Sequence, residues 1–216
     1  MEEKDNIAGN TGKGKSGALN LGFTKRDIAR ELARRYSTMT YQELDLLESL
    51  LIAMRYQRGD YVVKAGEVST NIYWIVKGLV RQFYFKNGKE VTEYMATENH
   101  IVMSIESLFE EKPSKQEIVC LEPSIIVAIS RPKLEQVAMK SVNIQILYRK
   151  ILEESLILSQ VQADMQRFES ASDRYLKLVK MQPQLVLRAP LVYVASLLQM
   201  TPETLSRIRT AQLNEE

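Results

Sequence analysis

The stretch APLVYVASLLQMTPETLSRIR, residues 189–209, decides how the last part of the chain folds. Its first half repeats apolar residues at the spacing of one helix face, at Leu191, Val194, Ala195 and Leu198. Gln199 and Met200 interrupt this pattern. The next residues, Thr201-Pro202-Glu203, suit a helix start, because they bring a side-chain cap, a proline without an amide hydrogen, and an acid near the positive end of the helix dipole. We predict two short helices joined by a turn.

The second of these helices presents little apolar surface outward. Leu205 and Ile208 can pack on the first helix, whereas the other side is polar and mixed in charge. This pattern is typical of a helix-turn-helix whose second helix enters the major groove. An arginine there can donate to guanine, a glutamate can accept from cytosine, and hydroxyls or a second arginine suit phosphates. The candidate DNA-binding residues are Thr201, Pro202, Glu203, Ser206, Arg207 and Arg209. A solvated helical hairpin would show the same pattern, so the stretch alone leaves both interpretations open.

Upstream of this hairpin, residues 141–168 contain no interior glycine or proline and predict one long helix. Positions spaced alternately by 4 and 3 form a seam, which consists of Leu147, Ile151, Glu154, Leu158, Val161, Met165 and Phe168. A second stripe, expected to face the rest of the chain, consists of Ile144, Tyr148, Leu152 and Leu156. An ordinary core helix has the same spacing, but the length of the seam favours a dimerisation helix. We expect the polar Glu154 to select the register, so that Glu154→Leu would tighten the dimer.

Between Gly59 and Ile129 the apolar pattern changes to a period of two, which predicts β-strands. The expected strands lie at 61–63, 72–76, 79–85, 101–105, 117–121 and 125–129. Asn87-Gly88, between two alternating runs, predicts a tight hairpin. Short strands at this spacing indicate a small barrel or a double-stranded jelly roll. Helices are expected over residues 23–54, with Thr24 and Thr40 as caps, and again from Pro132 onward.

Composition excludes several classes of function. The 216 residues include one cysteine, Cys120, and one histidine, His100, too few for a zinc site, an iron–sulfur cluster or a histidine-based catalytic set. The formal net charge is +2, so a basic surface for nucleic acid must be local. Neither a secretory signal nor an apolar run of about 18 residues occurs. We expect a cytoplasmic protein that is not an enzyme, has no metal or cofactor, and has no membrane partner.

Two stretches resemble the Crp/Fnr (cyclic-AMP receptor protein/fumarate–nitrate regulator) family of bacterial transcription factors: RGDYVVKAGEVSTNIYWIVKGLVR at 58–81 and the 189–209 stretch. The latter is similar to the recognition motif of the family's Bacteroidetes-like branch. The resemblance implies an α+β protein with a cyclic-nucleotide-binding-like barrel and flanking helices over 21–140, a dimerisation helix over 141–168, and a helix-turn-helix domain over 169–216. It also implies a homodimer on a near-palindromic DNA operator, with RNA polymerase as a further partner.

Residues 1–20 precede this match. They hold four of the nine glycines and few large apolar side chains, so we expect a disordered tail.

The sequence departs from the family where a cyclic nucleotide would bind. Family members that bind one carry a Gly-Glu pair and, later, an Arg-Ser or Arg-Thr pair. Glycine amides and the arginine bind the phosphate, and the glutamate holds the ribose hydroxyl. Here Ser104-Ile105 and Lys115-Gln116 stand at those places, among several acidic residues. We therefore expect no dependence on cyclic AMP and an unknown small-molecule effector. The candidate pocket residues are Ser104, Glu106, Lys115 and Gln116.

Further departures concern the DNA-binding end. The family often has glycine where Gln199 stands, so a left-handed Gln199 would be strained by about 1 kcal/mol. Residues 210–216 are too few for the usual wing hairpin, so we expect it to be reduced or absent. Residues 172–216 carry six basic and four acidic side chains, a modest positive excess. A ligand-sensing or protein-interaction module without DNA binding is therefore the alternative to a regulator.

Overall fold

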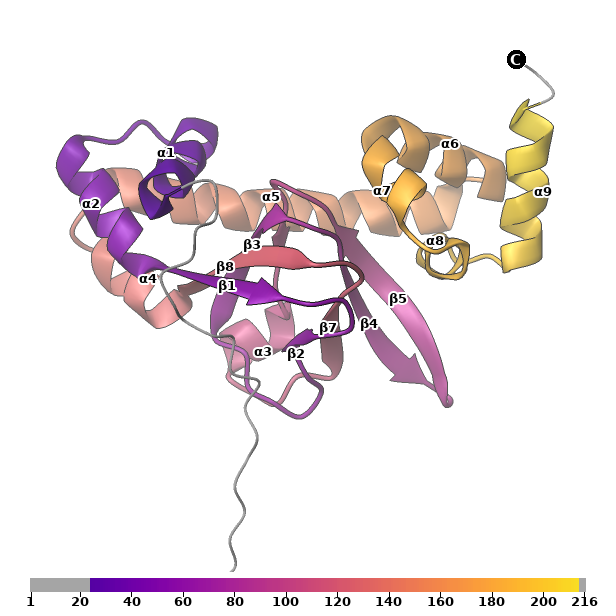
Figure 1. The fold of residues 1–216 in the computed structure, drawn as a ribbon, viewed down its shortest axis with the longest axis horizontal. Helices are drawn as coiled ribbons and strands as arrows, with labels where there is room; N and C mark the ends of the chain where they lie inside the picture. The colour runs from indigo at the N-terminus through magenta and orange to yellow at the C-terminus, as the bar shows by residue number, and fades with distance from the viewer. Residues whose placement is uncertain (1–23, 214–216) are drawn as a thin grey trace, which may run out of the picture.

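The computed structural model describes residues 24–213, so the expectation for the tail at 1–20 lies outside the described residues. This part of the chain consists of a β-sandwich, a long helix beside it, and a group of helices at each end of the long helix (Figure 1). It is the α+β architecture that the sequence predicts.

Two capped helices open the described chain, α1 (Lys25–Tyr36) and α2 (Tyr41–Leu50). Thr24 and Thr40 are their N-caps, and each forms a capping box with the acid three residues later. The predicted helix over 23–54 is wrong at its end, because Leu51 begins strand β1 (Leu51–Tyr56). An apolar run this short is compatible with a helix or a strand. Here it forms a strand, because β1 pairs with β8.

Eight strands form the sandwich within residues 24–213. After β1 they are β2 (Tyr61–Val63), β3 (Asn71–Lys77), β4 (Val80–Lys86), β5 (Lys89–Ala96), β6 (Ile101–Val102), β7 (Gln116–Cys120) and β8 (Ser124–Ser130). They make two four-stranded antiparallel sheets, in the orders β1-β8-β3-β6 and β2-β7-β4-β5. Ile75, Val80, Ile118 and Ile126, all fully buried, belong to the core between them. The sheets build the predicted jelly roll.

The loops of the sandwich confirm one prediction and correct another. Asn87 and Gly88 have φ values of 52° and 73° and join β4 to β5 in the expected hairpin. The strand predicted at 101–105 ends at Val102, and Ile105 instead begins helix α3 (Ile105–Glu110). With six residues, of which only the adjacent Ser107 and Leu108 are buried, α3 is too short to show a helical repeat in the sequence.

The long helix α5 (Val142–Phe168) follows α4 (Arg131–Ala138) and runs past the barrel to the C-terminal helices (Figure 1). Its first half is buried within its own chain: Leu147 is 0% exposed and Ile151 is 1% exposed, and both lie in the core that includes α1. Glu154 accepts a hydrogen bond from the Tyr36 hydroxyl at 2.6 Å and pairs with Arg35. The interpretation of Leu147 and Ile151 as partner contacts is therefore wrong, because the chain's own core buries both. Glu154 bonds to α1 but keeps 43% of its side chain exposed.

The second half of α5 has a different environment. Leu156 is 72% exposed, Ile157 63% and Phe168 79%. The stripe expected to face the rest of the chain is thus wrong at Leu156, although Ile144 at its other end is fully buried. Leu158, Val161 and Met165, the remaining seam residues, are half-buried.

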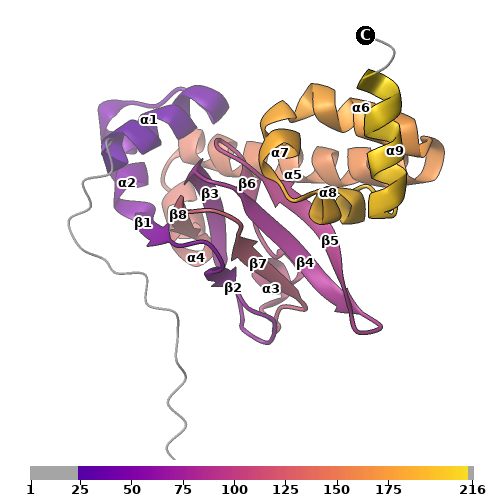
Figure 2. The ribbon, with the colours of Figure 1, turned by 45° about the vertical axis from the view of Figure 1, so that its right-hand side comes forward.

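Four helices close the described chain: α6 (Ala171–Met181), α7 (Pro183–Arg188), α8 (Leu191–Leu197) and α9 (Pro202–Leu213). Sequence analysis did not predict α7. Their apolar core includes Leu79 and Met95 of the sandwich, each 1% exposed. Figure 2 shows α8 against β5. The C-terminal helices therefore pack directly on the barrel.

Candidate nucleic-acid interface and effector cavity

The second helix of the predicted helix-turn-helix is α9, and its polar side faces solvent. Leu205 is fully buried and Ile208 packs against the same core, which fixes the helix on its neighbours. Glu203, Ser206 and Arg207 are exposed on the opposite side. The structure thus brings these three candidate DNA-binding residues to one uncovered helix face.

The start of α9 has the predicted capping chemistry. The Thr201 hydroxyl accepts a hydrogen bond from the Thr204 amide at 3.2 Å, and Pro202 is the first helical residue. Hydrogen bonds from its own amide and from Thr201 lower the pKa of Glu203, which therefore remains an ionised acceptor. Arg209 is half-buried, so it is less available than Arg207.

The turn between α8 and α9 contains a left-handed residue at the position where the family often has glycine. Gln199 has φ 53°, and the Met200 amide donates to the Ala195 carbonyl at 3.0 Å to close the end of α8. Arg174 on α6 also supports the turn, because its Nε donates to the Leu198 carbonyl at 3.0 Å. This hydrogen bond makes Arg174 part of the domain's own structure.

A polar joint attaches the helix-turn-helix to the barrel. The Arg81 guanidinium, 2% exposed, lies 4.3 Å from the ring centre of Phe83 and 3.9 Å from that of Tyr193 on α8. Beside it, the Thr92 amide donates to the Ser196 hydroxyl at 2.9 Å. Sequence reasoning missed this joint, since no local pattern reports that a buried strand arginine meets a tyrosine more than a hundred residues later.

A second polar contact lies beside the first. Arg188, in the last turn of α7, donates to both oxygens of Glu98 at 2.7 and 3.0 Å and also to Glu122. The Gly78 amide donates to the same Glu98 at 2.8 Å. Burial acts to raise the pKa of Glu98, but the hydrogen bonds from Arg188 and Gly78 outweigh it and lower the pKa to about 2.

A cavity of about 390 Å³ lies between the barrel and α5, a volume suited to a small molecule. Of the four candidate pocket residues, Glu106 and Gln116 line it, together with Glu93 and Glu110. Ser104 is instead 2% exposed and hydrogen-bonded to Ser114 at 2.9 Å. The sequence therefore identified the region of the cavity but only part of its wall.

Several hydrogen-bond donors in and beside the cavity wall are already bound within the protein. The Gln82 amide group donates to the Met103 carbonyl at 3.2 Å and to Gln116 at 2.7 Å, and Gln116 donates to Glu93. Lys115 pairs with Glu106 at 2.6 Å. The donors of Gln82, Gln116 and Lys115 are therefore used within the chain, beside the carboxylates of Glu93 and Glu110.

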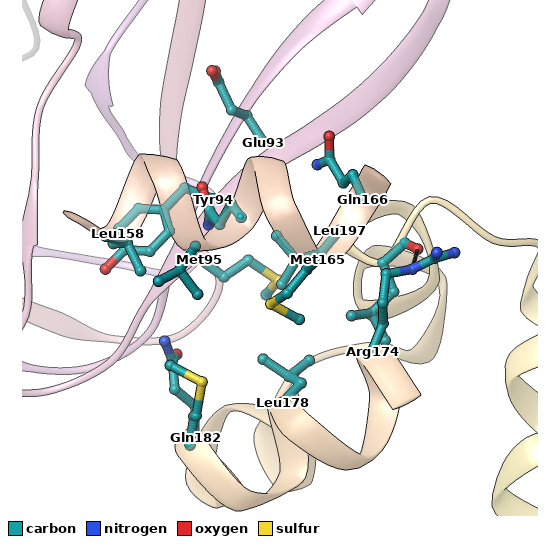
Figure 3. A pocket seen from close by; sticks show the side chains of 14 residues that line it. Glu93, Tyr94, Met95, Leu158, Met165, Gln166, Arg174, Leu178, Gln182 and Leu197 are labelled. Atoms are coloured by element: carbon teal, nitrogen blue, oxygen red, sulfur yellow. Dashed lines mark hydrogen bonds between the residues drawn. The ribbon is translucent and has the colours of Figure 1, made fainter. Parts of the chain in front are cut away.

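A smaller apolar pocket of about 50 Å³ lies where barrel, α5 and C-terminal helices meet (Figure 3). Met95, Leu158, Met165, Leu178 and Leu197 surround it from β5, α5, α6 and α8. Three seam residues of α5, Leu158, Val161 and Met165, thus face the chain's own domains at this point.

Comparisons with known proteins agree with this geometry. Residues 53–141 match the cyclic nucleotide-binding domain family. FixK2 from Bradyrhizobium japonicum has a similar structure, with 16% identity, a TM-score of 0.66, and coverage of 76% of this chain and 85% of that chain. The c-di-GMP responsive global regulator CLP from Xanthomonas campestris gives 15% identity, a TM-score of 0.61, and coverage of 82% and 93%.

A third similar structure is the catabolite activator protein of Thermus thermophilus, with 20% identity, a TM-score of 0.51, and coverage of 85% of this chain and 87% of that chain. A search among curated proteins found no match. The barrel, the long helix and the terminal helix-turn-helix together define the fold of the Crp/Fnr regulators, and this chain has that fold. None of the comparisons tests the Bacteroidetes-like branch.

None of the helices in residues 24–213 combines the length and apolar character that crossing a bilayer requires.

Proposed function

We propose that the protein is a homodimeric, DNA-binding transcriptional regulator of the Crp/Fnr type and is not an enzyme. The observation that carries this proposal is the exposed polar face of α9, with Glu203, Ser206 and Arg207 on it. Leu205 and Ile208 hold the opposite side against the domain core, so the polar face is free to enter a major groove. A DNA operator and RNA polymerase in the cytoplasm are the proposed partners.

Homodimerisation is proposed through the second half of α5. Leu156, Ile157 and Phe168 are large apolar side chains that solvent reaches in the single chain. A second copy of this helix would cover them, as in other paired amphipathic helices. Leu158, Val161 and Met165 line the apolar pocket of their own chain but are only half-buried there, and their uncovered parts would extend the same contact. Two copies would then present two α9 helices to successive half-sites.

The effector is proposed to occupy the cavity between the barrel and α5, and to be something other than cyclic AMP. A phosphate needs donors, whereas Glu93, Glu106 and Glu110 bring negative charge to the wall and Lys115 is engaged by Glu106. An anion placed there would lie among carboxylates.

The proposal is tested by selecting duplexes from a random pool with the full chain and measuring affinity by fluorescence anisotropy, with and without cyclic AMP. We expect enrichment of a near-palindromic site, with an affinity that cyclic AMP leaves unchanged. Failure to enrich any sequence would contradict the regulator, while a strong cyclic-AMP response would contradict only the effector proposal.

The alternative, a sensing or interaction module without DNA binding, has one observation in its favour. Arg174 and Lys177 are engaged by Glu169 or by carbonyls of the domain itself, and Arg188 is held by the barrel. Fewer cations of this domain are then available for phosphates. Retention on heparin that falls steeply with salt would support the regulator, and absence of retention would support the module.

A further inference from the structure

Arg188 occupies a position of particular interest in the helix-turn-helix. It ends α7 and stands three residues before Leu191, where α8 begins. In a helix-turn-helix bound to DNA, the first helix crosses the phosphate backbone while the second enters the groove. An arginine that leads into the first helix is therefore well placed to donate to a phosphate.

In the present structure that guanidinium is already occupied. Glu98 accepts two hydrogen bonds from it, and Glu122 accepts another. Two-pronged binding of this kind is what arginine also forms with a phosphate. Both acids lie in loops of the barrel, so the contact joins the two domains rather than stabilising the helix-turn-helix alone.

The acids that hold Arg188 are themselves fixed in place. The Gly78 amide donates to Glu98, and Gly78 cannot be replaced by a larger residue, because a Cβ would lie 2.6 Å from that of Ser124. Next to them, the contact of Arg81 with Tyr193 and the hydrogen bond from Thr92 to Ser196 attach α8 to β4 and β5. The carboxylates therefore form a prepared acceptor for Arg188.

We propose that Arg188 is a DNA-phosphate contact, and that Glu98 and Glu122 imitate the phosphate to hold the helix-turn-helix on the barrel in a state with weak DNA affinity. The proposal rests on the regulator function proposed above. Duplex DNA and the two acids compete for one guanidinium, so release of α7 and α8 from the barrel accompanies tight binding.

The test neutralises the acids without changing their shape, in the variant Glu98→Gln/Glu122→Gln. The control, Glu31→Gln/Glu111→Gln, removes the same charge from two exposed sites whose partners are Arg34 and Arg131. Relative to that control, we expect roughly tenfold tighter binding to duplex, the change that corresponds to freeing one charge-assisted contact. Adding Arg188→Gln should lower the slope of log Kd against log salt concentration by about one per subunit.

A readout that does not need DNA accompanies the affinity. Hydrogen exchange of the Gly78 and Thr92 amides, which donate across or beside the joint, should accelerate in the double variant and not in the control. Should the double variant fail to fold, Glu122→Gln alone retains the Gly78 contact and gives the same comparison.

The outcomes separate the two proposals. Tighter binding in the double variant, lost again with Arg188→Gln, supports the phosphate imitation. If every protein binds duplex, and the double variant binds with the same affinity as its control, the phosphate imitation is overturned. The proposed regulator function is unaffected by that outcome. Absence of duplex binding by every protein overturns both.

Discussion

The two halves of α5 differ in how far the rest of the chain covers their apolar side chains. Around Leu147 and Ile151 the helix is sealed under α1, with at most 1% of either side chain exposed. Around Leu156 and Ile157 the same helix exposes more than half of each side chain, at 72% and 63%. This difference shows that the spacing of apolar residues predicts which helix face is buried. It does not predict whether the same chain or another molecule buries it. The first half folds the chain, and the second half is the proposed contact with another copy.

The largest expected effect tests the buried half. Ile151→Ala should lower the free energy of unfolding by about 2–5 kcal/mol, because it removes a fully packed side chain and leaves a cavity. Chemical denaturation measures it. The matched variant Leu156→Ala should change the stability of the isolated chain by about 0.5 kcal/mol or less. Similar losses for both would break the distinction between the halves.

The next effect tests the exposed half. Leu156→Asp should raise the dimer dissociation constant by about a hundredfold or more, since two charges would enter an apolar contact between copies. Sedimentation velocity over a concentration series measures the change, and circular dichroism checks that each chain remains folded. An unaltered dimer would place the interface on another surface.

Glu154 marks the boundary between the halves, and its replacement sharpens the comparison. Glu154→Leu should lower stability by about 1–3 kcal/mol, because the Tyr36 hydroxyl, in a residue 4% exposed, loses its acceptor. Burial and the hydrogen bond to Glu154 raise the pKa of Tyr36, so the phenol stays a neutral donor. Thermal unfolding measures the loss, with Glu153→Leu as the exposed control. A tighter dimer with unchanged stability would restore the register role predicted from sequence.

The smallest expected effect lies beyond α5, in the turn of the helix-turn-helix. Gln199→Gly should stabilise the protein by up to about 1 kcal/mol, since glycine accepts φ 53° without strain. Differential scanning calorimetry should show a rise in Tm of a few degrees. A fall in Tm would mean that the Gln199 side chain contributes more than its backbone costs.

Sequence patterns predicted the elements better than their contacts. Features that depend on a few neighbouring residues could be predicted from the sequence. They are the helix caps at Thr24 and Thr40, the hairpin at Asn87-Gly88 and the start of α9. Leu51 was assigned to a helix, because a short apolar run fits either structure until a partner strand is known.

In the candidate site, too, local features could be predicted from the sequence and long-range contacts could not. The face of α9 could be read from periodicity, since one helix contains it. Arg81, Arg188 and Glu98 could not, because their contacts join residues about 90 or more positions apart, and neither apolar period nor motif records such pairs. The sequence pointed to Glu106 and Gln116, which line a cavity, but not to the ion pair between Lys115 and Glu106 beside it.

The most direct test of the central claim, that the exposed face of α9 binds DNA in a dimer, is the affinity and stoichiometry of the full chain on its selected duplex. We predict two chains per duplex and a loss of about 1–3 kcal/mol per altered base contact with Arg207→Ala, whereas Leu187→Ala, at a site 74% exposed on α7, binds normally. Equal affinity of Arg207→Ala and the unaltered protein, or one chain per duplex at saturation, would contradict the account.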